Sequence, residues 1–166
     1  MITTHTSATI VRQAQQDDTY AILDLCECAH MESPRYRKLR FDPNKMEALI
    51  RAMIGTLATG SQGHVSVSEK SGSITGVFLG VMQEHFFGPD LVAREVLLYV
   101  RPGERGTFAR AAVKLLRTFE RWAVENGAVE IVVGSSTLIA TDTAKRLYEY
   151  LGYHTHGFAM LKRKGG

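Results

Sequence analysis

The 166-residue sequence predicts a single α/β domain in which four helices flank a mixed, largely antiparallel sheet of six to seven strands. Three observations lead to this prediction. Short apolar and β-branched runs, typical of strands, are bounded by Gly, Pro and Ser. Two such runs near the middle of the chain are separated by only a few residues, which predicts a hairpin. Elsewhere, apolar residues recur at steps of three and four, which predicts amphipathic helices.

The N-terminal part is predicted to contain a strand, two helices and a hairpin. Residues 8–12 form the strand, and the first helix ends before Pro34, because the residue before a proline disfavours helical geometry. The second helix opens at Pro43, a residue preorganised for the first helical position. Residues 64–69 alternate between polar and apolar and pair with residues 74–82 to form the hairpin.

The C-terminal part is predicted to alternate strands and helices. Its elements are strand, helix, strand, helix and two short closing strands, at residues 96–100, 107–123, 129–133, 142–151, 153–156 and 158–162. The first strand–helix–strand unit is a crossover, which is expected to be right-handed. No repeat or linker divides the chain, so residues 1–166 are treated as one domain.

Composition narrows the class of protein. The formal net charge of +3 is too small to imply nucleic-acid binding by itself. Cys26 and Cys28 form neither a zinc motif nor a disulfide framework, and as free thiols they favour a reducing compartment. The polar N-terminus has no signal-peptide pattern, and no apolar run is long enough to span a bilayer. We therefore expect a cytoplasmic protein with no bound metal and no membrane partner.

The turn that follows residues 96–100 is the first candidate site. A helix with Thr107 as its N-cap would present unpaired N–H groups and a partial positive charge, which suit a phosphate. Gly106 would let the phosphate approach the backbone, and Arg105 and Arg110 would add full positive charge. The alternative is an ordinary strand–turn–helix joint with solvated arginines, since neither GxxxxGK(S/T) nor GxGxxG is present.

A basic loop between the first two helices has two interpretations. Residues 35–40 read RYRKLR. The simpler interpretation is a solvated surface turn, and the alternative is a substrate gate or an anion contact.

Two motifs connect the chain with a known family. The first is Leu98–Pro102 followed by Arg105 and Gly106, and the second is AKRLYEYLGY at residues 144–153. With these motifs, the order of elements resembles the GNAT superfamily of N-acetyltransferases over essentially the whole chain. The first motif is similar to the family's acyl-CoA loop, Q/R-x-x-G-x-G/A. This chain departs from that pattern, because Phe108 and Arg110 occupy small-residue positions if the motif starts at Arg105.

The resemblance implies a site for acetyl-CoA. Coenzyme A would lie where the strands at residues 96–100 and 129–133 splay apart, with its pantetheine amides on the main chain of Leu98 and Val100. The pyrophosphate would lie on the amides of the following loop. The residues of that loop are Arg105, Gly106, Thr107, Phe108, Ala109 and Arg110.

The resemblance also implies catalytic residues. Tyr148 matches the tyrosine that many members place near the sulfur as general acid, although its spacing alone favours a core aromatic on an amphipathic helix. Glu95 stands where several members have a glutamate that acts as base directly or through water, although it also fits a solvent-facing strand end. A backbone N–H near Leu98 to Val100, freed by a bulge, would stabilise the oxyanion. Histidine as a residue type is suited to base chemistry near neutral pH, but His64 and His85 match no motif.

The expected function is the transfer of an acetyl group from acetyl-CoA to a primary amine, by direct attack in a ternary complex. The acceptor can be a small molecule, a protein or an aminoacyl-tRNA, and the sequence does not choose among them. Whether the protein forms a homodimer is also left open. The alternative is a GNAT-fold module that binds coenzyme A or a protein without turnover.

Overall fold

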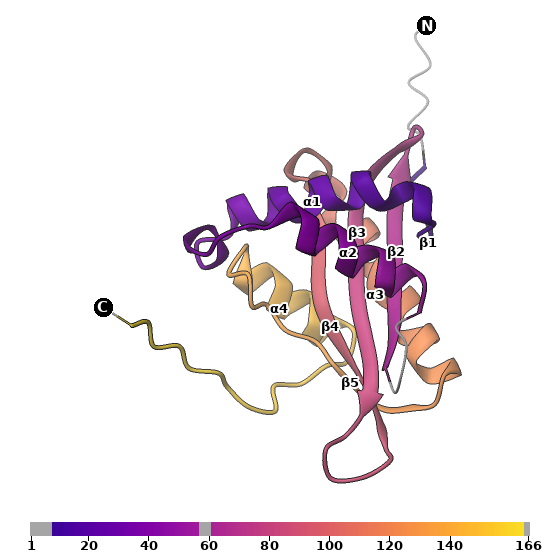
Figure 1. Cartoon of the computed structure of the whole chain (residues 1–166), viewed down its shortest axis with the longest axis vertical. Coiled ribbons are helices and arrows are strands. Elements are labelled where there is room, and N and C mark those ends of the chain that lie inside the picture. Colours follow the sequence, from indigo (N-terminus) through magenta and orange to yellow (C-terminus); the bar gives the residue numbers. More distant parts are fainter. Residues whose placement is uncertain (1–7, 57–60, 165–166) are drawn as a thin grey trace, which may run out of the picture.

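The computed structural model describes residues 8–56 and 61–164, with the side chains of residues 106–109 outside that description. A single five-stranded sheet in the order β1-β2-β3-β4-β5 forms its centre, with helices on both faces (Figure 1). The strands are β1 (Ile10–Gln13), β2 (Ser61–Lys70), β3 (Ser73–Glu84), β4 (Leu91–Val100) and β5 (Ala128–Val132). The helices are α1 (Thr19–Glu32), α2 (Pro43–Ile54), α3 (Phe108–Glu125) and α4 (Thr141–Tyr150). Short 3-10 turns lie at η1 (Gln16–Asp18), η2 (Tyr36–Lys38) and η3 (Pro102–Thr107).

The sheet is mixed and largely antiparallel, as the sequence predicts. Strands β1 to β4 pair antiparallel in sequence order, and the predicted hairpin is formed by β2 and β3. Strand β5 pairs parallel to β4, because α3 carries the chain back across the sheet before it. The four predicted helices are present, and α2 begins at Pro43, where the Asp42 side chain accepts a hydrogen bond from the Lys45 amide at 3.1 Å.

Each face of the sheet has its own apolar core. Helices α1 and α2 pack on one face through Ile22, Leu25, Ile50 and Met53. Helix α3 packs on the other face through Leu115, Leu116 and Phe119, and Leu147 of α4 joins this core. The close approach of α3 depends on Gly80 in β3, since a Cβ there would lie 2.4 Å from Phe119 Cε2.

The predicted strand count is wrong at the C-terminal end. Residues 153–156 and 158–162 form no strands, so the sheet has five strands rather than six to seven among residues 8–56 and 61–164. The large apolar side chains of the second segment are not buried, since Phe158 is 91% exposed and Met160 is 89% exposed. A strand requires an edge to pair with as well as a pattern, and this segment runs away from the sheet (Figure 1).

Strand β5 ends opposite the middle of β4, and the chain that follows β5 no longer pairs with β4, which gives the expected divergence. Their ladder ends at Arg94 and Val132, whereas β4 continues to Val100. Immediately after this point the β3–β4 register shifts, because Leu79 faces Leu97 while Gly80 faces Glu95. The extra residue of this bulge is Val96, which precedes the stretch from Leu98 to Val100 where a bulge was expected to free an N–H.

Candidate active site

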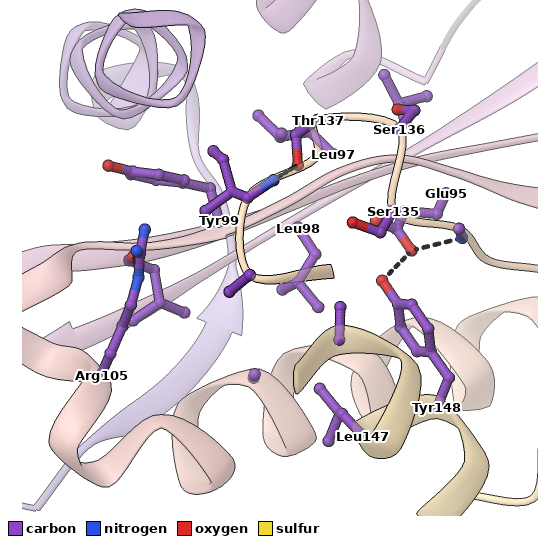
Figure 2. A pocket seen from close by; sticks show the side chains of 17 residues that line it. Glu95, Leu97, Leu98, Tyr99, Arg105, Ser135, Ser136, Thr137, Leu147 and Tyr148 are labelled. Carbon is purple, nitrogen blue, oxygen red and sulfur yellow. Dashed lines mark hydrogen bonds between the residues drawn. The ribbon is translucent and has the colours of Figure 1, made fainter. Parts of the chain in front are cut away.

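A crevice opens where β4 and β5 separate. Its walls are the free length of β4, the segment that follows β5 and one side of α4 (Figure 2). The lining residues are Glu95–Val100, Arg105, Ala112, Gly134–Thr137, Ile139, Ala140, Ala144, Leu147 and Tyr148.

Two side chains predicted from the sequence meet inside this crevice. The hydroxyl of Tyr148, from α4, donates a hydrogen bond to Oε2 of Glu95, from β4, at 2.9 Å (Figure 2). The Gly134 amide donates to the same oxygen at 3.3 Å. Leu147 is buried against the α3 core and fixes the rotation of α4, so that Tyr148, the next residue, faces the crevice. Glu95 is therefore a hydrogen-bonded crevice residue rather than a solvated strand end.

The environment gives the two groups different proton affinities. Burial raises the pKa of Glu95 to about 7, although hydrogen bonds from Tyr148 and from the Gly134 and Leu98 amides act in the opposite direction. Burial and the neighbouring Glu95 carboxylate both raise the pKa of Tyr148 well above its ordinary value. Near neutral pH, Glu95 can therefore accept and release a proton while Tyr148 stays protonated.

The two histidines considered as bases lie elsewhere. His64 is 1% exposed and packs among the rings of Phe78, Phe119 and Trp122. His85 lies in the turn after β3, where its Nδ1 accepts a hydrogen bond from the Phe87 amide at 3.3 Å. Neither histidine lines the crevice.

Arg105 lines the crevice and holds a carboxylate that the sequence did not single out. Its guanidinium binds Glu32, the last residue of α1, in bidentate fashion, at 2.5 Å for Nη1–Oε1 and 2.9 Å for Nη2–Oε2. Its Nε also donates to the Val100 carbonyl at 2.8 Å, and Tyr99 donates to Glu32 Oε2 at 2.9 Å. These contacts hold α1, β4 and η3 together beside the crevice. Because Glu32 is 73 residues from Arg105, no local pattern predicts this pair.

The expected pyrophosphate loop is placed by its backbone. Residues 102–107 form η3, and α3 begins at Phe108, directly after the residue expected as its N-cap. The side chains of Gly106, Thr107, Phe108 and Ala109 lie outside the described part of the chain. Arg110 is exposed in the first turn of α3.

The segment between β5 and α4 forms one side of the crevice. Its backbone is held in an unusual conformation by contacts with the chain after α1. Leu138 and Ala140 have φ values of 60° and 46°, in the left-handed region that residues with a side chain rarely occupy. Ser33 Oγ donates to the Thr137 carbonyl at 2.5 Å, and Tyr36 donates from its hydroxyl to Ser136 Oγ at 2.8 Å. The sequence predicted Ser33 only as the end of a helix, and its second role requires a partner 104 residues away.

The described residues contain neither a cluster of metal ligands nor a membrane-spanning helix. Among residues 8–56 and 61–164, no group of three or more His, Cys, Asp or Glu side chains is arranged to hold a metal ion. Within the same residues, no helix combines the length and the apolar character needed to cross a bilayer.

Comparison with known proteins supports the fold. No family model matches the chain, and no curated protein matches its sequence. A ribosomal-protein-alanine N-acetyltransferase from Brucella melitensis has a TM-score of 0.70 at 14% identity, over 95% of this chain and 99% of that one. An aminoglycoside N-acetyltransferase in complex with CoA has a TM-score of 0.70 at 14% identity, over 99% of this chain and 100% of that one. A transcriptional regulator from Bacillus halodurans has a TM-score of 0.72 at 15% identity, over 95% and 100%. These likenesses show a shared fold over nearly the whole chain.

Proposed function

The chain has the GNAT fold, and from this premise we propose that it is an N-acetyltransferase that moves an acetyl group from acetyl-CoA to a primary amine in a ternary complex. The observation that carries the proposal is the Glu95–Tyr148 hydrogen bond inside the crevice between β4 and β5. One of these groups titrates near neutral pH and the other remains a proton donor, a combination that suits the proton transfers of acetyl transfer.

Acetyl-CoA would occupy the crevice in an extended form. Leu98 and Val100 line it beyond the end of the β4–β5 ladder, so main-chain groups there can pair with the pantetheine amides. The pyrophosphate would bind the amides of residues 105–110 at the start of α3. We expect Arg105 to contribute its amide, because its guanidinium already binds Glu32, and Arg110 to contribute its charge.

The hydrogen-bonded pair supports a complete proton route. Glu95 accepts a proton from the acceptor ammonium, and the free amine attacks the thioester carbonyl carbon. The tetrahedral oxyanion is stabilised by a main-chain N–H near the β4 bulge, and the carbon–sulfur bond then breaks. Tyr148 gives its proton to the thiolate and is reprotonated by Glu95 across the 2.9 Å hydrogen bond. Of the two protons lost by the ammonium, one leaves on coenzyme A and one goes to solvent.

A binding module without turnover is the second candidate. Phe108 and Arg110 stand where the acyl-CoA motif has small residues if the motif starts at Arg105, and bulk there would restrict the approach of pyrophosphate. In addition, one protein of the same fold is a transcriptional regulator. A shared fold does not by itself establish an activity.

The test measures coenzyme A binding and thiol release separately. Wild-type protein, Tyr148→Phe and Tyr150→Phe are assayed with acetyl-CoA and a mixed panel of amines. Tyr150 is a matched control, because it lies on the same helix and is 77% exposed. We expect thiol release by the wild type and Tyr150→Phe, and a large loss in Tyr148→Phe. Thermal stabilisation by coenzyme A with no turnover of any amine would instead support the binding module.

A further inference from the structure

Positive charge is concentrated in two segments that lie far apart in the sequence. Residues 35–40 and 162–164 contain seven of the chain's 20 lysines and arginines and none of its 17 acidic residues. The rest of the chain therefore has more acidic than basic side chains, although the whole has a formal charge of +3. These side chains, here called the basic cluster, are Arg35, Arg37, Lys38, Arg40, Lys162, Arg163 and Lys164.

Folding brings the two segments together. Arg163 Nη2 donates a hydrogen bond to the main-chain oxygen of Arg35 at 3.0 Å, across 128 positions of sequence. The loop between α1 and α2 and the C-terminal segment lie on the same side of the molecule (Figure 1). The seven cations therefore form one surface region rather than two.

The charges of the basic cluster are not neutralised. Six of its side chains are exposed, and Arg35 is partly buried with its guanidinium 5.1 Å from the centre of the Tyr36 ring. In the described part of the chain, none of the seven forms an ion pair with a carboxylate, whereas Arg105 and others do. The neighbouring acid Glu32 is occupied by Arg105 and Tyr99, and Asp42 caps α2. Unpaired like charges gathered on one surface attract a polyanion.

The basic cluster adjoins the proposed active site. Arg35 Nη1 donates to the Ser136 carbonyl at 3.2 Å, and Tyr36 donates to Ser136 Oγ. Ser136 lines the same crevice as Glu95 and Tyr148 (Figure 2). A polyanion bound to the cluster would therefore lie beside the opening through which an amine reaches Glu95.

We propose that the acceptor is an aminoacyl ester at the 3′ end of an RNA chain, whose phosphate backbone binds the basic cluster. This inference rests on the proposed N-acetyltransferase function. Four of the seven cations are arginines, whose planar forks match phosphate oxygens, and the Tyr36 ring among them offers a stacking surface to a base. An isolated carboxylate or phosphate would require only one or two of these cations.

The proton chemistry of the site is consistent with this acceptor. An α-amine titrates near 7.7–8.0, whereas a lysine side chain titrates near 10.4. A base with a pKa of about 7, such as Glu95, is better matched to the α-amine, because efficient proton transfer requires similar proton affinities.

The first test measures binding without catalysis. Fluorescence anisotropy measures the binding of labelled bulk tRNA that carries no amino acid to the wild-type protein. The titrations contain no coenzyme A and are made between 50 and 200 mM KCl. We expect affinity to fall steeply with salt, because phosphate contacts release counterions. The variant Arg37→Glu/Arg40→Glu/Arg163→Glu should bind at least about tenfold more weakly at low salt, with a flatter salt dependence. The control Lys114→Glu/Arg117→Glu/Arg121→Glu makes the same change of charge on the exposed side of α3 and should bind like the wild type.

The second test compares acceptors. Thiol release is measured with tRNA charged with amino acids and with the methyl esters of the same amino acids. We expect the wild type to have a higher kcat/KM for aminoacyl-tRNA than for the methyl esters. The variant at residues 37, 40 and 163 should lose this preference, while its rate with methyl esters stays unchanged. That unchanged rate also shows that the variant is folded.

The outcomes separate this inference from the proposed function. If methyl esters are acetylated as fast as charged tRNA, or if the two triple variants behave alike, the RNA acceptor is wrong and the proposed function stands. Competition by poly-glutamate as effective as by tRNA would assign the surface to an acidic protein and overturn the inference. If no amine of any kind is acetylated, the proposed function fails and the RNA acceptor fails with it.

Discussion

Tyr148 and Glu95 share a 2.9 Å hydrogen bond that joins α4 to β4 across 53 positions of sequence. The bond also couples their titrations, because the Tyr148 hydroxyl lowers the pKa of the carboxyl that burial raises. Because the two titrations are coupled, a change at either residue should alter the pH dependence of the proposed reaction.

Replacing Tyr148 by phenylalanine should reduce turnover and also move the pH profile. We expect kcat to fall roughly 100-fold or more, which is the size of effect typical of a lost general acid, with the affinity for coenzyme A nearly unchanged. Loss of the hydroxyl removes an interaction that lowers the pKa of Glu95, so the acidic limb of kcat/KM should move to higher pH. Steady-state kinetics across pH, with Tyr150→Phe as control, checks both effects. An unchanged kcat would remove Tyr148 from the mechanism.

The proposed activity of the wild-type protein should show a pH dependence set by Glu95. Glu95 must be deprotonated to accept a proton, so kcat/KM should rise with pH and reach half its plateau at about pH 7. The assay uses an acceptor whose amine has a pKa of about 10, as a lysine side chain does, so that the titration of the acceptor does not overlap with that of Glu95. In Glu95→Gln the inflection near pH 7 should disappear together with most of the activity. Retention of the inflection in that variant would assign it to another group.

Acid should destabilise the fold through His64. Burial among aromatic rings lowers the pKa of His64 from 6.5 to about 4, so below pH 6.5 the unfolded chain binds a proton that the folded chain does not. Its contribution to stability is therefore complete above pH 6.5 and is lost as the pH falls toward 4, by about 3 kcal/mol. Urea unfolding of the wild type and His64→Gln at several pH values gives the difference. Parallel stability curves for the two proteins would contradict the assignment.

Removing Glu32 should loosen the contact between α1 and β4. The carboxylate binds Arg105 in bidentate fashion and accepts the Tyr99 hydroxyl, with side-chain exposures of 31% for Glu32 and 22% for Arg105. We expect Glu32→Ala to lower the free energy of unfolding by about 1–3 kcal/mol, because the guanidinium is left partly buried without its partner. Tyr99→Phe removes a single hydrogen bond and should cost about 1 kcal/mol. Equal effects for the two variants in urea unfolding would mean that the ion pair adds nothing.

A glutamate at Gly106 should weaken coenzyme A binding. The substitution adds bulk and negative charge to the loop proposed to hold the pyrophosphate. We expect the Kd to rise at least about tenfold, since each 1.4 kcal/mol of lost binding corresponds to that factor. Gly103→Glu, in the same 3-10 turn, is the matched control, because a Cβ at Gly103 would meet no atom within 4 Å. Calorimetry that gives the same affinity for both variants would locate the pyrophosphate elsewhere.

The candidate site shows which inferences local pattern supports. Tyr148 lies in the motif at residues 144–153, and Glu95 occupies the start of a strand where members of the resembled family have a glutamate; the structure places both in the crevice. The basic loop at residues 35–40 was recognised, but its simpler interpretation was a solvated turn. Its contacts with Ser136 and with Arg163 come from segments more than 100 residues away, which no local pattern contains.

The fold divides in the same way. The sequence by itself determined the four helices, the hairpin and the crossover, because periodicity, caps and turns act over a few neighbouring residues. Tertiary structure alone decided that the closing strands do not form, since β-pairing depends on an available edge. It also decided that Arg105 binds Glu32 and that β4 bulges at Val96, since both depend on contacts with distant elements.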